Sequence, residues 1–399
     1  MRTQKKRLLI AAILCISIFQ MGMVALSPVI QAITKAFPGT SSLTAQMAMT
    51  FLNLFQVIFA LLSGIITDRI GRRWTGTVGI ALTALAGICG PLLSKALWTL
   101  FIWSAMLGAG AGMFVPVASN LMVAYLDEAE QKRVLGFQSA AANIGAVFLS
   151  LLAGVLASVH WSNAYLVYLT ALPVIFLCIA GIPKAPPAAA DVKAASEAAV
   201  PDTGTPGKAR IPLRVWLGGA QTFIFAVCYF AYSTNISLLL DERGITSTTV
   251  SGVFTAIFML GGCVIGLNFG RIMGLVRRKT PALAFALLVV TYLLIYAVEL
   301  WPVTLIAAFV AGGSLSLLFP YLLMTAMKGV DPRVSVISTS VIVAVCPNLG
   351  SFVSPVVISG ITGSFGGTLI ADRFLTAAVI AGVLTILLLV TSGSRRAAD

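Results

Sequence analysis

The sequence predicts an all-α polytopic membrane protein with twelve transmembrane helices in two pseudo-symmetric six-helix bundles. Of its 399 residues, 59% are hydrophobic and only 10% are charged, whereas a soluble domain carries about 25% charged residues. So little charge cannot coat a water-soluble globule, and lipid must cover much of the surface. In hydrocarbon every backbone polar group needs an internal partner, which leaves helices or a closed barrel. Segments such as Thr99–Met113 and Phe285–Ala297 lack the alternation of barrel strands, so helices are predicted.

Twelve stretches are long and apolar enough to cross a bilayer, which takes about 20 residues of helix. The basic segment Met1–Arg7 precedes the first of them. Because that stretch is longer than the apolar region of a signal peptide, we interpret it as a retained helix. The first six spans are predicted at 8–33, 45–67, 75–94, 98–125, 134–159 and 163–183, and the second six at 213–239, 248–272, 280–299, 302–327, 335–362 and 371–393.

The distribution of basic residues predicts the orientation. With an even number of spans both termini lie on one side, and most of the 26 Lys and Arg residues fall on that side. Only Lys35, Lys95, Arg243 and Arg373 fall on the other. Since positive charge is retained in the cytoplasm, we expect an integral protein of the cytoplasmic (inner) membrane with both termini cytoplasmic. The net charge of +13 then reflects topology, and no nucleic acid partner is expected because the basic residues form no groove with interleaved aromatic residues.

A change in composition divides the chain into two parts. Ala, Pro, Gly, Lys and Asp dominate residues 184–211, and such a stretch cannot bury enough apolar surface to order itself. We therefore expect a flexible cytoplasmic linker there. The N-terminal six-helix bundle is predicted at 1–183, and the C-terminal six-helix bundle at 212–399.

The two bundles share sequence patterns, which indicates an internal duplication. The fourth and tenth spans each contain a glycine followed at the same spacing by a proline, and the fifth and eleventh spans share an Asn-x-Gly triplet. Internal repeats are typical of secondary transporters, which bind substrate near the membrane midplane between the repeats. The matching residues are Gly108 and Pro116 with Gly312 and Pro320, and 143–145 with 348–350.

The loop after the second span has the sequence GIITDRIGRR. Gly64 allows close helix approach at the end of the span, and Gly71 supplies the backbone freedom for a tight reversal. Asp68 is the only acid among arginines, so its carboxylate can pair with one of them or face the N-terminus of another helix. The predicted gating motif comprises Gly64, Asp68, Arg69, Gly71, Arg72 and Arg73.

This loop resembles the G-x-x-x-D-R-x-G-R-R/K signature between the second and third spans of the major facilitator superfamily (MFS). The resemblance covers the whole chain, since twelve spans, cytoplasmic termini and a long middle loop all match. It implies the MFS fold of a drug- or metabolite-type transporter, with a latch in which Asp68 and Arg72 tie the halves together on the cytoplasmic side while the cavity opens outward. A degraded second copy, Gly266–Arg278, has Gly270 in place of the acid, which implies that one half supplies the main latch.

Two differences from the proton-driven exporters of that family bear on function. Those exporters often carry an arginine in the fourth span where this sequence has Ser104. Their fifth span carries G-x-x-x-G-P, whereas Gly145 is followed here by Leu149 and Ser150 at the corresponding positions. The differences weaken the prediction of a drug/proton efflux antiporter, which stays as an alternative.

No Asp, Glu, Lys, Arg or His is predicted at the middle of any span. A charge there costs about 2.5–3.5 kcal/mol and usually serves ion or proton coupling. Recognition must therefore rely on amides, hydroxyls, aromatic rings and backbone dipoles, which favours a small, neutral or amphipathic organic substrate. The candidate substrate-binding residues, for which hydrogen bonding between helices is the competing interpretation, are Gln20, Gln56, Phe114, Asn143, Tyr229, Tyr232, Asn235, Ser316, Tyr321 and Asn348.

We expect no enzymatic activity, cofactor or metal. The single histidine, His160, and the six cysteines form no ligand cluster, and no nucleophile and base are paired at depth. No Gly-rich nucleotide-binding loop is present. The predicted function is secondary active or facilitated transport of a small molecule across the bilayer by alternating access, carried out by a monomer. The alternative from another class is a transport-inactive membrane sensor with the same fold.

Overall fold

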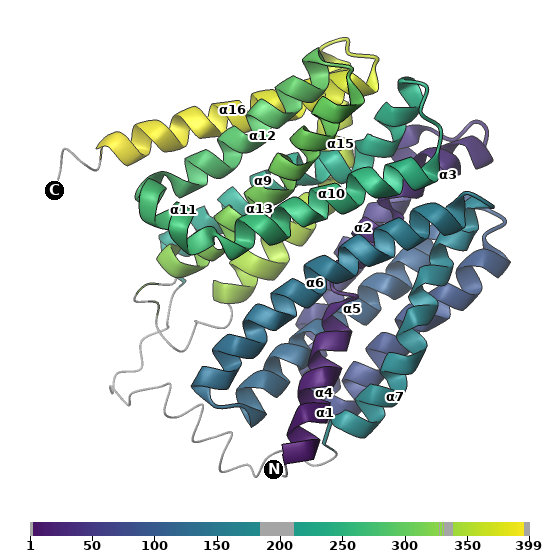
Figure 1. The fold of residues 1–399 in the computed structure, drawn as a ribbon, viewed down its shortest axis with the longest axis vertical. Helices are drawn as coiled ribbons and strands as arrows, with labels where there is room; N and C mark the ends of the chain where they lie inside the picture. Colours follow the sequence, from purple (N-terminus) through teal and green to yellow (C-terminus); the bar gives the residue numbers. More distant parts are fainter. Residues whose placement is uncertain (1–2, 184–210, 327, 329, 331–337, 395–399) are drawn as a thin grey trace.

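The computed structural model describes residues 3–183, 211–326, 328, 330 and 338–394, and these residues form helices without any strand (Figure 1). The predicted linker lies outside the described residues, apart from Ile211. Within the described residues, ten helices are long and apolar enough to cross a membrane. One of these helices holds two spans, and the first span consists of shorter helices. The prediction of twelve spans in two six-helix bundles is therefore confirmed.

The first span is divided near its middle. The backbone N–H groups of Phe19, Gln20 and Gly22 donate to carbonyls three residues back, so the regular helical ladder is interrupted. The prediction of one continuous helix over 8–33 is wrong at this point, because the fifth and sixth spans contact Ile18 and Gly22 and hold a turn there. The pieces are α1 (Thr3–Ser17), α2 (Gly22–Leu26), the 3-10 helix η1 (Ser27–Val29) and α3 (Ile30–Ala36).

The second and third spans are joined without a loop in the helix α4 (Ser42–Leu93). The chain changes direction at Gly71, whose φ of 83° and ψ of 154° lie in a region that suits glycine. A capping box between Asp127 and Glu130 begins the fifth span. The remaining elements of this half are α5 (Leu97–Tyr125), α6 (Glu128–Ala157), the 3-10 helix η2 (Trp161–Ala171) and α7 (Leu172–Gly181).

The second half repeats this order with local differences. The seventh span of the chain, the first of this half, is a single helix. The eighth span ends at Leu267, so the predicted span at 248–272 is too long. Asn268 turns the chain into a separate short helix. The elements are α9 (Leu213–Glu242), α10 (Thr248–Leu267), α11 (Phe269–Val276), the 3-10 helix η3 (Arg277–Lys279), α12 (Thr280–Ala297), α13 (Trp301–Ala326), the π-helical segment η4 (Val341–Val345), α15 (Cys346–Ser364) and α16 (Ile370–Ser394).

Each half has a hydrophobic core of its own. With the exception of Leu238, the buried apolar residues of the first core lie between Leu9 and Ile182. The second core lies between Val215 and Ala381, with Val24 and Ala146 of the first half added. Many large apolar side chains remain exposed on the outer faces, as for Ile386 at 65%. Such a surface suits lipid on the outside of two separately packed bundles.

The repeated glycines make equivalent contacts in the two halves. A Cβ atom built on Gly108 of the fourth span would overlap a carbonyl oxygen of the second span, and one built on Gly312 of the tenth span would overlap a carbonyl oxygen of the eighth. The glycines of the fifth and eleventh spans touch the first and seventh spans in the same way. Small residues at these positions allow close approach of the helices. The contacts are Gly108 to Leu52, Gly312 to Phe258, Gly145 to Ile18 and Gly350 to Phe223.

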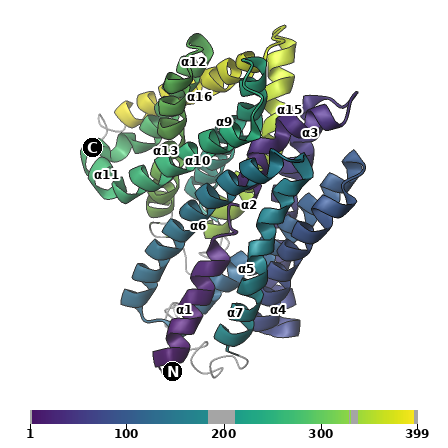
Figure 2. The same ribbon diagram turned by 45° about the vertical axis from the view of Figure 1, so that its right-hand side comes forward.

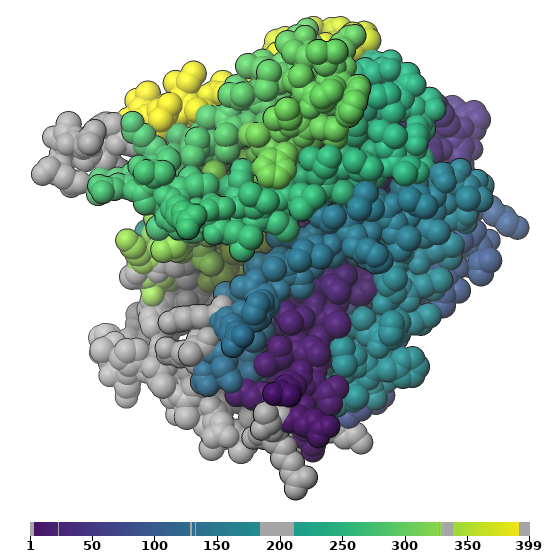
Figure 3. Space-filling model, viewed as in Figure 1, coloured from purple at the N-terminus to yellow at the C-terminus, as the bar shows by residue number. Residues whose placement is uncertain are grey.

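The halves meet chiefly along two pairs of helices, α6 with α10 and α4 with α15, and also where η1 contacts α9 and α10 and where α3 contacts α9. Figures 1 and 2 show α6 and α10 side by side, with α1 and the start of α6 at the opposite end from α3. The space-filling view in Figure 3 shows the two halves in contact over α6 and α10. We call the end that carries the loops at 37–41, 243–247 and 365–369 the far side, and the end that carries the N-terminus and Gly71 the terminus side.

Candidate functional site between the two halves

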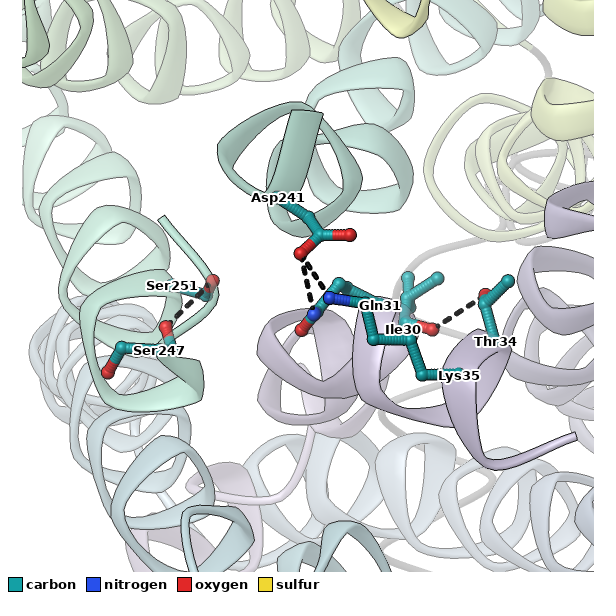
Figure 4. Close-up of polar contacts among 7 residues, drawn as sticks. All are labelled: Ile30, Gln31, Thr34, Lys35, Asp241, Ser247 and Ser251. Atoms are coloured by element: carbon teal, nitrogen blue, oxygen red, sulfur yellow. Dashed lines mark hydrogen bonds and ion pairs between the residues drawn. The ribbon is translucent and has the colours of Figure 1, made fainter. Parts of the chain in front are cut away.

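A carboxylate of the second half binds two side chains of the first half on the far side. Asp241, near the end of α9, accepts hydrogen bonds from Gln31 Nε2 at 2.9 Å and from Lys35 Nζ at 2.5 Å (Figure 4). Gln31 and Lys35 lie four residues apart, so they share one face of α3. Hydrogen bonds to an ionised group are stronger than neutral ones, and this pair therefore joins the halves at one point of the far side.

A second cluster surrounds Arg373 in the first turn of α16. Its guanidinium donates to Asn235 Oδ1 at 3.0 Å and to Ser42 Oγ at 3.0 Å. Gln46 Nε2 donates to the same Asn235 oxygen at 2.8 Å and to the Thr234 carbonyl at 2.7 Å. Ser42 and Gln46 belong to the first half, and the other three residues belong to the second. The sequence-predicted candidate Asn235 is therefore part of the far-side contact between the halves.

The helices themselves approach closely on the far side. Gly154 of α6 lies against α10, where a built Cβ atom would stand 2.7 Å from the Thr248 carbonyl oxygen and 3.1 Å from Gly252 Cα. The Thr248 hydroxyl donates to the Gly154 carbonyl at 2.9 Å. Neither glycine has a side chain, so the two backbones pack directly against each other. We call this contact between Gly154 and residues 248–252 the glycine seam.

Charged groups beside these contacts are held within the second half. The Glu242 carboxylate accepts the Ile370 N–H at 3.1 Å at the start of α16. Arg243 donates to the Ile295 carbonyl and, at 3.2 Å, to Thr304 Oγ1. Burial lowers the pKa of the Arg243 guanidinium, and the carboxylates of Glu299 and Glu242 oppose that shift. These bonds hold the ends of α9, α12, α13 and α16 together beside the contact with the first half.

Gln20 lies in the break of the first span, halfway through the membrane-crossing segment. Its side chain is half-buried and makes no hydrogen bond with any residue that the structure describes. The preceding residue, Phe19, is buried in the core of the first half. Irregular backbone and polar groups at membrane depth are tolerated only where protein or water covers them. The structure thus leaves the Gln20 amide without a partner among the described residues.

Asn143 and Ser316 come together from opposite halves around Gly262 of α10. The Ser316 hydroxyl donates to the Gly262 carbonyl at 2.8 Å, and a Cβ atom built on Gly262 would stand 3.4 Å from Asn143 Oδ1. The Asn143 amide N–H donates back to the Ser139 carbonyl at 3.0 Å. Asn143 lies midway along α6, so both side chains occupy the middle level of the interface.

Asn348 and Gln56 lie on the other pair of interface helices. Asn348 is half-buried and donates to the Ala344 carbonyl at 2.8 Å, repeating the geometry of Asn143 in the first half. It directly follows Pro347, which lacks an N–H and lies after the π-helical segment Val341–Val345. Gln56 is half-buried midway along the second span and makes no hydrogen bond with a described residue.

Three aromatic candidates lie inside the cores of the halves. Phe114 is 1% exposed in the first core. Tyr229 and Tyr232 are 2% and 0% exposed, and the Tyr232 ring stacks on Phe258 at 4.3 Å between centroids. The Tyr229 hydroxyl donates to the Gly312 carbonyl of α13, and the Tyr232 hydroxyl donates to the Phe254 carbonyl of α10. The structure therefore places these aromatic side chains away from the interface between the halves.

The last candidate lies toward the terminus side. Tyr321, near the end of α13, donates its hydroxyl to the Arg278 carbonyl at 3.4 Å, close to α11. The structure thus brings together Asn143 and Ser316 at the middle level of the interface. Gln20, Gln56 and Asn348 lie near the middle of other spans. The structure separates Asn235 toward the far side and Tyr321 toward the terminus side.

The predicted gating motif lies around the bend at Gly71, midway along α4 on the terminus side. Asp68 is exposed and makes no ion pair with any residue in the described part of the chain. Arg72 Nη1 and Arg73 Nε are buried, yet neither atom has a hydrogen-bond partner among the described residues. A buried N–H group without an acceptor costs about 1–3 kcal/mol, and more when it is charged. These two N–H groups of the motif therefore lack an acceptor among the described residues.

The described part of the chain has no acidic residue at the middle level of the interface and no group of metal ligands. Each acid that the structure describes lies at a helix end, in a loop or beside the bend at Gly71. Among the described residues no group of His, Cys, Asp and Glu could hold a metal ion. The chemistry of the middle level is that of amides, a hydroxyl and backbone groups.

Sequence reasoning missed four residues that the structure places at contacts between or within the spans. Gln31 and Gln46 are amides inside predicted spans, the same signal that selected Gln20, but they lie far from the midplane. The sequence places Arg373 at a span end, whereas its side chain enters the interface between the halves. Tyr168 has no signal in the sequence, since its hydroxyl bonds to a carbonyl 146 positions earlier in the chain.

Two pseudo-symmetric bundles of apolar helices, with polar side chains at the middle of their interface, define a polytopic membrane transporter. The model of the Major Facilitator Superfamily matches residues 12–355, and the chain belongs to that family. It is an integral membrane protein of a family of small-molecule transporters rather than enzymes.

Solved structures of transporters share the fold. The crystal structure of the POT family transporter PepTSo is similar with a TM-score of 0.75 and 13% identity, over 100% of this chain and 99% of that one. A mutant of the nucleoside transporter NupG has a TM-score of 0.69 and 10% identity, over 96% and 99% of the chains. A bacterial homologue of the human lysosomal transporter Spinster, inward-facing and unoccupied, has a TM-score of 0.68 and 13% identity, over 99% of this chain and 96% of that one. No curated protein matches the chain.

Proposed function

We propose that this protein moves a small, neutral or amphipathic organic molecule across the cytoplasmic membrane by alternating access, with both termini in the cytoplasm. The observation that carries the proposal is the set of half-buried polar side chains midway along the spans, two of them meeting at the interface between the halves, with no charge among them. Gln20 and Gln56 have no hydrogen-bond partner among the described residues, and Asn143 contributes a carbonyl oxygen beside Ser316. Such groups bind hydroxyls, amides and carbonyls of an uncharged ligand.

The pattern of contacts supports a state that is closed on the far side. Hydrogen bonds accepted by Asp241 and donated by Arg373, together with the glycine seam, join the halves there. On the terminus side, Arg72 and Arg73 carry buried N–H groups without acceptors among the described residues. In the proposed cycle these groups gain acceptors when the terminus side closes, while the far-side bonds break. The basic loops favour the terminus side as the cytoplasmic one.

A ligand screen tests the proposal directly. Purified protein is screened by thermal shift against neutral metabolites and drugs, and each stabilising compound is then tested for counterflow in proteoliposomes. We expect Gln20→Leu to weaken the affinity for a transported compound about fivefold to tenfold, the effect of one hydrogen bond. Gln4→Leu makes the same change at an exposed position of the same span and should leave affinity unchanged. A compound that stabilises the protein and never crosses would instead favour a sensor.

Flux is expected not to require a pH gradient, because the described acids lie away from the middle level. The four acids of the far side are engaged there: Asp241 with Lys35, Glu242 with Ile370 N–H, Asp372 with Thr368 N–H at 3.0 Å, and Glu299 near Arg243. Counterflow and net flux are measured with and without an imposed gradient. A requirement for the gradient would contradict this part of the proposal, and neutralisation of all four acids then shows whether the coupling passes through them.

A further inference from the structure

The hydroxyl of a fully buried tyrosine reaches the break in the first span. Tyr168 lies in η2 at 0% exposure, and its hydroxyl donates to the Gly22 carbonyl at 2.6 Å. Gly22 begins α2, directly after the turn that contains Gln20. A Cβ atom built on Gly22 would stand 3.8 Å from the tyrosine ring, so the ring also covers this end of the turn.

The third span holds Tyr168 in place. A Cβ atom built on Gly87 would lie 3.0 Å from Tyr168 Cβ and from the Leu169 nitrogen, so η2 packs directly on the α4 backbone. The neighbouring Tyr165 ring occupies the position beside Gly90 in the same way. On the other side of the break, Gly145 of the fifth span lies against Ile18, and a Cβ atom built on Gly145 would stand 2.7 Å from the Ile18 carbonyl oxygen. The turn is therefore held between η2 and α6.

We propose that Tyr168 is a positioning residue that fixes the break in the first span and thereby directs the Gln20 amide toward the substrate. The inference rests on the proposed function for its second part, since it assumes that Gln20 binds substrate. A turn without the regular helical bonds has few internal bonds to hold it, so a single strong bond at Gly22 restricts its motion. Losing that bond leaves the fold intact and loosens residues 18–22.

The second half supplies a matched control. Tyr292 of α12 is also 0% exposed, and its hydroxyl donates at 2.7 Å to the Cys228 carbonyl in the first span of its half. There the receiving helix α9 is continuous from Leu213 to Glu242. Tyr168→Phe and Tyr292→Phe remove the same group from the same kind of site, and only the first site lies at a helix break.

Hydrogen–deuterium exchange of the full-length protein in lipid nanodiscs tests the first part. In Tyr168→Phe we expect the amides of residues 19–24 to exchange about tenfold faster than in the unchanged protein, as the loss of one buried bond implies. Tyr292→Phe should leave residues 19–24 unchanged. Equal exchange at residues 19–24 in the two variants would overturn the proposal.

Transport kinetics test the link to binding. For a radiolabelled compound that has passed the counterflow screen, Tyr168→Phe should raise KM about fivefold with little change in maximal rate, whereas Tyr292→Phe should not alter KM. Faster exchange with an unchanged KM would overturn the proposal that the break orients Gln20. If no compound is transported, the proposed function fails, and the exchange result then decides the role of Tyr168 by itself.

Discussion

Gly154→Val is expected to force the halves apart on the far side and to reduce transport about tenfold or more, because overpacking a close contact costs about 1–3 kcal/mol. The added methyl groups would meet the Thr248 carbonyl and the Gly252 backbone, which belong to the other half. The strain therefore falls on the contact between the halves rather than on either core. The closed far side becomes less stable relative to the open one, and the cycle stops in the open state.

Distances between spin labels measure this opening. Labels at Lys95 and Phe365, exposed loop positions on the far side of the two halves, should move apart in Gly154→Val in a background without native cysteines. Gly136→Val is the control, since it makes the same change on the same helix at a position with open space around it. Thr248→Ala removes the hydroxyl bond of the seam and should give a smaller opening. An unchanged distance with full transport in Gly154→Val would show that the seam need not close.

Asp68→Asn is expected to lower flux about tenfold or more while ligand binding stays intact, since couplings between conformational states are commonly about 1–3 kcal/mol. In the proposed cycle the Asp68 carboxylate and the arginines beside it secure the closed terminus side. The asparagine keeps the size of the side chain and removes its charge. The thermal shift produced by a bound compound should be the same in both proteins, because the motif lies at the bend of α4 on the terminus side, away from Gln20 and Asn143.

The control for this change lies on the same side of the molecule. Asp127 caps α6, and asparagine is an equally good cap, so Asp127→Asn should retain flux. Arg72→Gln should repeat the loss seen in Asp68→Asn, and the double variant should lose little more, as partners in one latch do. Full flux in Asp68→Asn, or strictly additive losses, would contradict the latch.

The span count and the duplication could be predicted because they depend on local composition. Each apolar run must form a helix to satisfy its backbone, and Gly108 and Gly312 mark the same contact in both halves. The break at residues 18–21 could not be predicted from the first span, since it depends on Tyr168 and Gly145 in other spans. The lack of a proline in that turn removed the usual signal of a helix break.

The chemical character of the candidate site could be predicted from the sequence, but the individual residues that form it could be predicted only in part. The amides of Gln20, Asn143 and Asn348 are costly in lipid wherever they point, so their position alone indicates a covered or wet environment. Aromatic residues carry no such information, because a ring suits a core as well as a binding site. Phe114 and Tyr232 are therefore core residues in the structure, although hydropathy could not distinguish the two faces of their helices.

The direct joining of the second and third spans at Gly71 has a mechanical consequence. No loop separates the two helices within α4, so there is no slack chain to absorb a change in the angle between them. A tilt of either helix must be taken up by the torsions of Gly71, as at a hinge, or be transmitted as a displacement of Asp68, Arg72 and Arg73. The lever arms of this hinge are both full membrane spans, so a small rotation at Gly71 is magnified at the opposite surface of the bilayer.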